Sequence, residues 1–338
     1  MKIANIMAGA KVGGAELFFE RFNSALAELK DFSVLPIIRQ DKARADRLRT
    51  ENLTPKELSF GGPLDFITRF RLRKLLNEYK PDVVMAWMSR AAMHTPKGDW
   101  TLIARLGGYY DLGYYKNCDH LVGNTQDIVD WIISEGWPSD RAHYLPNFCP
   151  DFSKATVFRP STIPKDAKLI LTAGRLHTDK AFDVLIKALS YLPKAHLLIV
   201  GEGPERSSLE LQASALSIED RVHMPGWSQE MPSLFAACDI FVCPSRIEPL
   251  GNVVIEAFSA GKPIVAAASK GPKVLISDEQ SGLLAPLENA EILAQQIERV
   301  LNDPQLAERL SKVARLEFEQ KYAKKPVMAR WVEFLEKI

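Results

Sequence analysis

Two glutamates, Glu248 and Glu256, flank a glycine in the stretch SRIEPLGNVVIEAFSAGKPIV, residues 245–265. The apolar run that leads into this stretch reads as a buried strand, and the spacing after Gly251 predicts a helix through Ala260. One glutamate therefore belongs to a strand-to-helix loop, and the other lies one turn inside the helix. Carboxylates in these places are suited to bind hydroxyl groups of a ligand held at the start of the helix.

The start of that helix is suited to bind an anion. Its first backbone amides, those of Gly251, Asn252 and Val253, have no partner inside the helix, and the helix dipole adds positive potential. Phosphate repels carboxylates, so the two glutamates are expected to bind neutral hydroxyls on either side of it. A nucleotide-sugar has this composition, because its ribose and its sugar flank a diphosphate. The alternative is structural: Glu256 shares a solvated stripe with Asn252 and Ser259, and the other glutamate is a loop charge.

A second candidate phosphate site is the stretch LTAGRLHTDKAFDVLIKAL, residues 171–189. A strand is expected to end at Ala173 and a helix to start near Lys180. A lysine at a helix start opposes the positive end of the dipole, and an anionic ligand would remove that conflict. Arg175 has a fork that binds two phosphate oxygens, and Lys180 adds a point charge. Otherwise both are surface cations, with Asp179 as their cap and partner.

Two further turns that contain glycine are weaker signals. Gly13 and Gly14 follow the first expected strand and precede a helix, which permits a ligand to approach the backbone closely, although a tight turn alone would also place glycines there. Their pattern is not GxGxxG, which argues against a nicotinamide dehydrogenase. The sequence GEGP, residues 201–204, follows another strand and is expected near the same ligand.

These motifs fall where strand-like runs give way to helical patterns. The expected strands are 2–7, 32–38, 82–87, 101–106 and 120–124 in the first half and 168–174, 196–201, 221–226, 239–245 and 263–269 in the second. Helices are expected over 15–30 and 67–80. Strands that alternate with helices form parallel sheets, and ligands bind beyond the carboxyl ends of such strands. The predicted fold class is α/β, with two doubly wound parallel-sheet domains facing across a cleft.

The length of 338 residues also favours two domains. A polar stretch that includes Pro160 and Pro164 has no clear period and is expected to link them. We therefore assign residues 1–150 to the first domain, 151–166 to the linker, and the residues from 167 onward to the second domain.

Composition argues against several other classes of protein. The net charge of +1 gives no overall attraction to nucleic acid. The four cysteines form no CxxC pair and complete no zinc pattern with the six histidines, so reduced thiols and no metal site are expected. The N-terminus does not read as a signal peptide, and no run approaches the roughly 20 apolar residues of a membrane span. A cytoplasmic protein is predicted.

Together the motifs resemble those of the retaining glycosyltransferases of family 4, also known as glycosyl transferases group 1. These enzymes have the GT-B fold, with two Rossmann-like domains. The resemblance lies in GRLHTDK at 174–180, GEGP at 201–204, RVHMPGW at 221–227, CDIFVCPSRIEPLGNVVIEAFSAGKPIV at 238–265 and SGLLAP at 281–286, and more weakly in GGAE at 13–16. Similar bacterial enzymes extend lipopolysaccharide or exopolysaccharide.

The resemblance implies roles for the candidate residues. Arg175, Lys180 and Glu248 would be catalytic: the two cations would hold and stabilise the leaving diphosphate, and the glutamate would bind the donor sugar. The donor would also be bound by Gly13, Gly14, Trp227, Leu250, Gly251, Asn252, Val253 and Glu256. Trp227 would border the base, and Glu256 would bind the ribose. The cations would replace a metal, so no metal and no cofactor are expected. Residues 167–318 would form the donor domain, and 319–338 a helix that crosses back to the first domain.

The chain also departs from the family pattern. Many members carry a histidine near the end of the strand TLIARL, where this chain has Arg105, and the context of His94 does not match. Ala181 stands where glycine is common, with little effect expected, and Leu250 stands where phenylalanine is usual.

The first domain is expected to bind the acceptor. Arg105, Tyr109 and Tyr110 are weak candidates, since aromatic rings stack on sugars and tyrosine adds a hydroxyl, although an ordinary packed loop is an equal alternative. The predicted helix 67–80 carries Arg69, Arg71, Arg73 and Lys74 on an amphipathic pattern. This pattern is typical of helices that lie on anionic membranes, and also of ordinary surface helices.

We therefore expect a retaining hexosyltransferase that acts by metal-independent front-face substitution. The donor would be a nucleotide-sugar, with UDP preferred over GDP, and the acceptor a glycan or lipid-linked glycan such as lipopolysaccharide core, at the inner face of the membrane. Two alternatives stay open at this point. A sugar-nucleotide epimerase on the same scaffold would convert the donor without an acceptor, and a non-catalytic binding protein would bind the donor without turnover.

Overall fold

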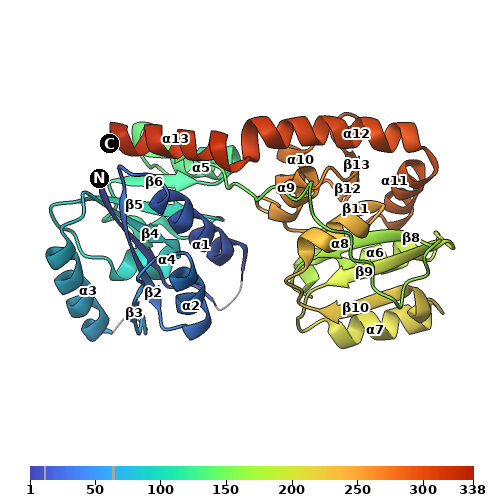
Figure 1. The fold of residues 1–338 in the computed structure, drawn as a ribbon, viewed down its shortest axis with the longest axis horizontal. Helices are drawn as coiled ribbons and strands as arrows, with labels where there is room; N and C mark the ends of the chain where they lie inside the picture. Colours follow the sequence, from blue (N-terminus) through green and yellow to red (C-terminus); the bar gives the residue numbers. More distant parts are fainter. Residues whose placement is uncertain (11–12, 63–64) are drawn as a thin grey trace. The chain divides into compact units, whose positions relative to one another are not determined.

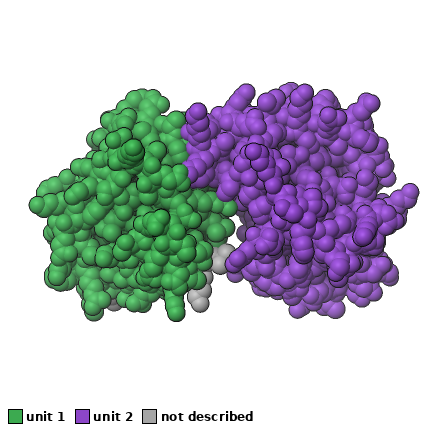
Figure 2. All heavy atoms as spheres, viewed as in Figure 1, with its two compact units in different colours: residues 1–147, 327–338 green, residues 148–326 purple. Residues whose placement is uncertain are grey.

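The computed structural model describes residues 1–10, 13–62 and 65–338 (Figure 1). The chain divides into two compact units, which Figure 2 shows in different colours. Unit 1 comprises Met1–Asn147 and Val327–Ile338, and unit 2 comprises Phe148–Pro326. Each unit contains one parallel β-sheet with helices packed against it.

Over the described residues, the sheet of unit 1 has seven strands in the order β3-β2-β1-β4-β5-β6-β7. The strands are β1 (Lys2–Met7), β2 (Ser33–Arg39), β3 (Lys56–Leu58), β4 (Val83–Trp87), β5 (Thr101–Leu106), β6 (His120–Gly123) and β7 (Ala142–Tyr144). The α-helices are α1 (Gly14–Ala27), α2 (Lys42–Thr50), α3 (Phe66–Tyr79), α4 (Met88–His94), α5 (Gln126–Ser134) and, from Val327 onward, α13 (Lys324–Lys337). A 3₁₀ turn over Leu112–Tyr115 follows β5, and another over Ser139–Arg141 precedes β7.

The sheet of unit 2 has six strands in the order β10-β9-β8-β11-β12-β13. The strands are β8 (Lys168–Ala173), β9 (Ala195–Val200), β10 (Val222–Gly226), β11 (Ile240–Cys243), β12 (Ile264–Ala267) and β13 (Leu283–Ala285). The α-helices are α6 (Phe182–Leu189), α7 (Arg206–Ala215), α8 (Met231–Ala237), α9 (Asn252–Ser259), α10 (Lys270–Leu275), α11 (Ala290–Asn302) and α12 (Pro304–Glu317). A π-helical turn, Phe318–Tyr322, follows α12.

Alternating residues along β8 show why this sheet is covered on both faces. Ile170 packs in one buried cluster with Leu185 of α6. Its neighbours Leu169 and Leu171 pack in a second cluster with Phe258 of α9. A strand buried on both faces needs a nearly continuous apolar sequence, and parallel connections through helices supply the cover. The predicted α/β class is confirmed.

The predicted strands are all present, with shifts of a residue or two at their ends. Sequence analysis missed β3, β7 and β13, each three residues long and each at the edge of its sheet. Three residues do not establish a period, so alternation carries no signal there.

The stretch predicted as a linker, 151–166, contains no helix or strand and packs on unit 2. Phe152 and Ile163 are 7% and 2% exposed, within the same buried cluster as Phe258. At the other end of the chain, Trp331 of α13 is fully buried, with its ring centroid 4.6 Å from that of Phe22. The final helix thus completes the core of unit 1. Within the described residues, no helix combines the length and apolar character that a bilayer crossing requires.

Candidate active site

Lys180 and Glu248 form an ion pair at the carboxyl edge of the sheet in unit 2. The lysine Nζ lies 2.5 Å from Oε2 of Glu248, and the two side chains are 25% and 11% exposed. Burial alone lowers the pKa of Lys180, but the charge of Glu248 and its hydrogen bond outweigh this effect and raise the pKa above its usual value. The Ser245 hydroxyl donates to the same carboxylate oxygen over 3.3 Å. A shielded cation and a carboxylate therefore lie side by side where ligands of α/β sheets bind.

The loop that carries Lys180 differs from the predicted one. Residues Thr178–Lys180 form a 3₁₀ turn, Ala181 is left-handed with φ 51°, and α6 starts at Phe182. The predicted helix is present but starts two residues after Lys180, and the turn and the left-handed alanine separate the lysine from the first helical turn. The Lys180 ammonium donates to the carboxylate of Glu248, which belongs to another loop. Asp179 instead contacts His177, with its carboxylate 3.3 Å from Nδ1 of the ring.

The GEGP segment supports the loop that holds Arg175. The Gly174 amide donates to Val200 O over 3.0 Å, and the Leu176 amide donates to Glu202 O over 3.0 Å. A methyl group on Gly201 would lie 2.9 Å from the carbonyl carbon of Gly174, which no real side chain tolerates. The two loops can approach this closely only because glycine occupies that position. Arg175 itself is exposed at the surface of this pair of loops.

Trp227 lies beside the same loops. It follows Gly226, whose carbonyl accepts the amide of Gly201 over 2.9 Å, and its side chain is 55% exposed. An exposed indole next to a glycine loop offers a flat apolar surface to a ligand.

Helix α9 starts as predicted, at Asn252 after Gly251, which has φ 88° and so favours glycine. Asn252, Val253 and Glu256 are half-buried. Ser259 is fully buried and donates to Pro150 O over 2.5 Å, so the alternative of a solvated stripe is wrong at that residue. The first turn of α9 and the loop before it belong to the same edge of the sheet as Lys180.

Leu250, predicted among the donor-binding residues, has a buried side chain. Leu250 is 5% exposed and packs with Leu275 in the core below the loop. Gly271, which sequence analysis did not consider, donates its amide to Glu248 O over 2.7 Å. A methyl group on Gly271 would lie 2.6 Å from the Leu250 carbonyl carbon. The loop is therefore fixed from below by a glycine of α10.

In unit 1, Gly13 and Gly14 lie at the start of α1. The carboxylate of Glu16, 5% exposed, accepts the Ala10 amide over 2.7 Å. Methyl groups on Gly9 and Gly13 would lie 3.0 and 3.3 Å from the Glu16 carboxyl carbon. The backbone of Gly13 is extended, with φ 174°, a conformation that any residue adopts. The reason for a glycine there is therefore the nearby Glu16 carboxylate, which leaves little room for a side chain.

Arg105 is not placed to meet an acceptor directly. It is 1% exposed, donates to Asn147 Oδ1, and has its guanidinium carbon 4.7 and 4.9 Å from the ring centroids of Trp87 and Phe18. Burial lowers the pKa of Arg105 to about 9. The prediction that it binds the acceptor does not fit this burial, because protein groups surround the guanidinium.

The other candidates in unit 1 lie nearer the surface. Tyr109 is 37% exposed and donates to Asp127, while Tyr110 is half-buried. His94 is 1% exposed with its ring edge-on to Phe60, so it is a packed core residue.

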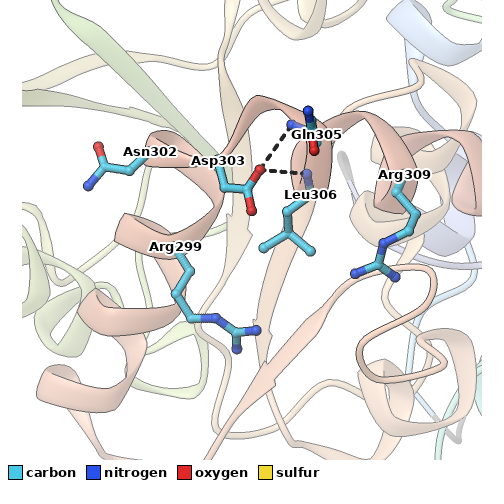
Figure 3. Close-up of a pocket in the computed structure, with 6 residues that line it drawn as sticks. All are labelled: Arg299, Asn302, Asp303, Gln305, Leu306 and Arg309. Carbon is cyan, nitrogen blue, oxygen red and sulfur yellow. Dashed lines mark hydrogen bonds between the residues drawn. The ribbon is translucent and has the colours of Figure 1, made fainter.

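A hollow of about 580 Å³ between α11 and α12 shares no residue with the site above (Figure 3). Its two arginines are engaged nearby: Arg299 pairs with the Glu279 carboxylate over 2.9 Å, and Arg309 donates to the Glu279 carbonyl over 2.7 Å. Asp303 caps α12 by accepting the amides of Gln305 and Leu306. None of the residues predicted to bind a ligand lines this hollow.

Comparisons with known proteins agree with the motifs. Residues 153–317 match the family model described as "Glycosyl transferases group 1". The chain is 33% identical over 321 residues to lipopolysaccharide core biosynthesis glycosyltransferase LpsE of Rhizobium meliloti (strain 1021), covering 92% of each chain. It is 32% identical over 341 residues to LpsD of the same organism, covering 100% of this chain and 98% of LpsD.

Solved structures of other proteins have the same fold. The structure of Anabaena Alr3699/HepE in complex with UDP and glucose superposes with a TM-score of 0.85 over 100% of both chains, at 21% identity. At 21% identity this likeness establishes the fold, which is GT-B, and nothing about the substrates. By its relationship to full-length relatives, the chain belongs to the group 1 glycosyltransferases.

Proposed function

We propose that this glycosyltransferase moves a hexose-type sugar, with retention of configuration, from a nucleotide-sugar to a lipid-linked glycan such as lipopolysaccharide core. The names of LpsE and LpsD support the acceptor class. UDP is the preferred carrier, and the solved complex of HepE with UDP-glucose makes that donor the first probe. The observation that carries the proposal is the Lys180–Glu248 pair, at 2.5 Å, beside the start of α9.

In this proposal the diphosphate replaces Glu248 as the partner of Lys180. Before the donor binds, the ammonium is paired with Glu248 and only 25% exposed. Its position is therefore fixed in advance, and water screens its charge only weakly. Arg175 adds a second cation, and the amides at Gly251, Asn252 and Val253 receive the distal phosphate. Glu248, freed from the lysine, accepts hydrogen bonds from hydroxyls of the donor sugar, Glu256 accepts them from the ribose, and Trp227 borders the base.

The chemical step is a front-face substitution. The acceptor hydroxyl oxygen bonds to the anomeric carbon while the bond from that carbon to the phosphate oxygen breaks on the same face. The departing phosphate oxygen takes the proton of the hydroxyl. Lys180 and Arg175 stabilise the negative charge that develops on it, a task that the proposal assigns to these cations and not to a metal.

A direct test incubates the protein with UDP-glucose and other UDP-hexoses and with deacylated lipopolysaccharide core. We expect UDP release that depends on the acceptor and on Lys180, that persists in EDTA, and that gives an anomeric proton with the donor's configuration by NMR. An inverted product would refute retention. UDP release no greater than that of Lys180→Met, for every donor and acceptor tried, would refute the proposed donor site.

Contact with an anionic membrane is the second part of the proposal, and α3 provides the surface. Thr68, Leu72 and Leu76 face the core of unit 1. On the exposed side, Phe66, Ile67 and Phe70 are 65%, 67% and 73% exposed. Large apolar side chains seldom cluster in this way on a surface without a partner.

The cations of α3 complete this surface. Arg71, Arg73 and Lys74 are exposed next to the apolar side chains, whereas Arg69 is half-buried and donates to Met93 O over 3.3 Å. Lys74 lies 3.8 Å from the Glu78 carboxylate at the surface, so Arg71 and Arg73 are the main cations offered to lipid head groups. We expect cosedimentation with phosphatidylglycerol vesicles and loss of it in Phe66→Ser/Phe70→Ser. Leu211→Ser, which changes a 72% exposed leucine of unit 2, is the matched control. Equal binding by the double variant would refute the surface.

A further inference from the structure

Arg246 joins three loops of unit 2. It follows β11, and its guanidinium lies between a loop after β8 and the loop between β13 and α11. The Nη1 atom donates to Thr178 O over 2.7 Å and to Asp183 Oδ1 over 2.8 Å. The Nη2 atom donates to Asp183 Oδ2 over 2.6 Å and to Glu288 Oε2 over 2.9 Å, while Nε pairs with Glu288 Oε1. Its two Nη atoms thereby make four hydrogen bonds to protein oxygens, and Nε adds an ion-pair contact with Glu288.

The contact continues along the chain for the next two residues. The Ile247 amide donates to Asp179 O over 3.1 Å, and Glu248 accepts from Lys180 Nζ over 2.5 Å. Residues 246–248 thus contact residues 178–180 one after another. A shift of either loop would separate the lysine from the glutamate, so the position of the pair depends on this run of contacts.

Glu288 gives a second sign that the arrangement is specific. It has φ 60°, a left-handed conformation that is unfavourable for a residue with a side chain and that glycine or asparagine adopts more easily. A glutamate in that conformation directs its carboxylate to Arg246. The hydrogen bonds to Asp183, followed by that to Glu288, raise the pKa of Arg246 further above its usual range.

We propose that Arg246 is a positioning residue for the donor site: it fixes the loop after β11 against the loop after β8 and so sets the Lys180–Glu248 pair. The inference rests on the proposed function for its catalytic consequence, because Arg246 acts through these two residues. Lysine can replace it only in part, since one ammonium lacks the planar fork that binds two carboxylates and a carbonyl.

The first test follows the lysine directly and needs no ligand. Limiting acetic anhydride reacts with unprotonated amines, and mass spectrometry gives the rate at each lysine. In Arg246→Gln we expect Lys180 to be acetylated at least threefold faster than in the wild type, with Arg246→Lys in between. Lys187, exposed on α6, should be unchanged. The control Arg299→Gln removes another arginine bound to a glutamate, 2.9 Å from Glu279, and should leave both rates unchanged.

The second test measures whether loss of Arg246 weakens nucleotide binding at the proposed donor site. Calorimetric titration with UDP is expected to show about tenfold weaker binding by Arg246→Gln and unchanged binding by Arg299→Gln, at a temperature where circular dichroism shows each variant folded. Unchanged acetylation of Lys180 in both Arg246 variants would overturn the inference. An equal rise in the acetylation rate of Lys187 would also overturn the inference, because it would show that the substitution destabilises unit 2 as a whole. If wild-type protein binds no UDP while Lys180 still responds, the proposed donor site fails and the positioning role stands.

Discussion

Replacement of Lys180 by methionine isolates the ion pair on which the proposed site depends. Methionine retains most of the length of the stem and removes the ammonium, so Glu248 keeps its charge and loses its cation. The carboxylate is 11% exposed and retains the Ser245 hydroxyl at 3.3 Å. A shielded carboxylate with one neutral partner is poorly solvated, and unit 2 should become less stable.

The size of the effect follows from the exposure of the two side chains. Loss of one partner from a fully buried pair costs about 3–5 kcal/mol. Lys180 is 25% exposed, so water offsets part of that cost, and we expect about 2 kcal/mol. For a unit of this size the loss corresponds to a fall in Tm of about 4–8 °C. The companion change Glu248→Gln removes the charge that was left unpaired, so the double variant should be no less stable than Lys180→Met alone.

The assay is a double-mutant cycle by urea unfolding, with a coupling energy of about 1–2 kcal/mol expected at pH 7. Because the pKa of Lys180 is raised on folding, the stabilisation is fully present below about pH 10.5 and is lost as the pH rises through the higher folded pKa. The wild type should therefore lose stability above that pH relative to Lys180→Met. A coupling energy below about 0.3 kcal/mol, with parallel pH profiles, would show that the pair does not form in solution.

Three further changes test other parts of the structure. Gly201→Ala should destabilise unit 2 by about 3 kcal/mol and weaken UDP binding, because its methyl group would lie 2.9 Å from the Gly174 carbonyl carbon. A urea unfolding curve like that of the wild type would contradict the close approach of the two loops. Burial first, and then the charge of His120, lower the pKa of His143 in the folded protein to about 4, so between pH 6.5 and 4 the unfolded chain binds a proton that the folded chain does not. The free energy of unfolding should therefore fall less steeply over this pH range in His143→Phe than in the wild type. An equal slope in the two proteins would refute this prediction. Arg105→Ala should lower the free energy of unfolding of unit 1 by about 3–5 kcal/mol and Arg105→Met by about 1 kcal/mol, because the 1% exposed side chain fills space in the core. Similar losses for the two variants would show that the charge of Arg105 matters and its volume does not.

The sequence predicted the elements that carry the site better than the contacts that assemble it. Each strand that ends at a motif could be found because it is apolar over several residues, and the start of α9 because Gly251 interrupts the pattern before it. The partner of Lys180 could not be found, since it is 68 positions away and no local rule joins the two. The nearest carboxylate along the chain, Asp179, was the only alternative that local reasoning offered.

The residues that sequence analysis missed share this cause. Arg246 stands inside a quoted motif, and its role appears only when Asp183 and Glu288 meet it in three dimensions. Gly271 lies in a short helix with no recognisable pattern, and its need for glycine comes from the Leu250 carbonyl above it. Arg105 is a different case: it was proposed as a weak acceptor-binding residue from its place at a strand end, whereas Trp87, Phe18 and Asn147 bury it.

The central claim is that the loops after β8 and β11 and the start of α9 bind a nucleoside diphosphate. Calorimetric titration of the purified protein with UDP, and with GDP for comparison, tests it most directly when repeated on Glu256→Ala. Glu298→Ala, at an exposed position of α11, is the matched control. We expect saturable binding of UDP that Glu256→Ala weakens at least tenfold and Glu298→Ala leaves unchanged. Absence of binding for both nucleotides, or equal binding by Glu256→Ala, would contradict the assignment of this edge of unit 2 as the donor site.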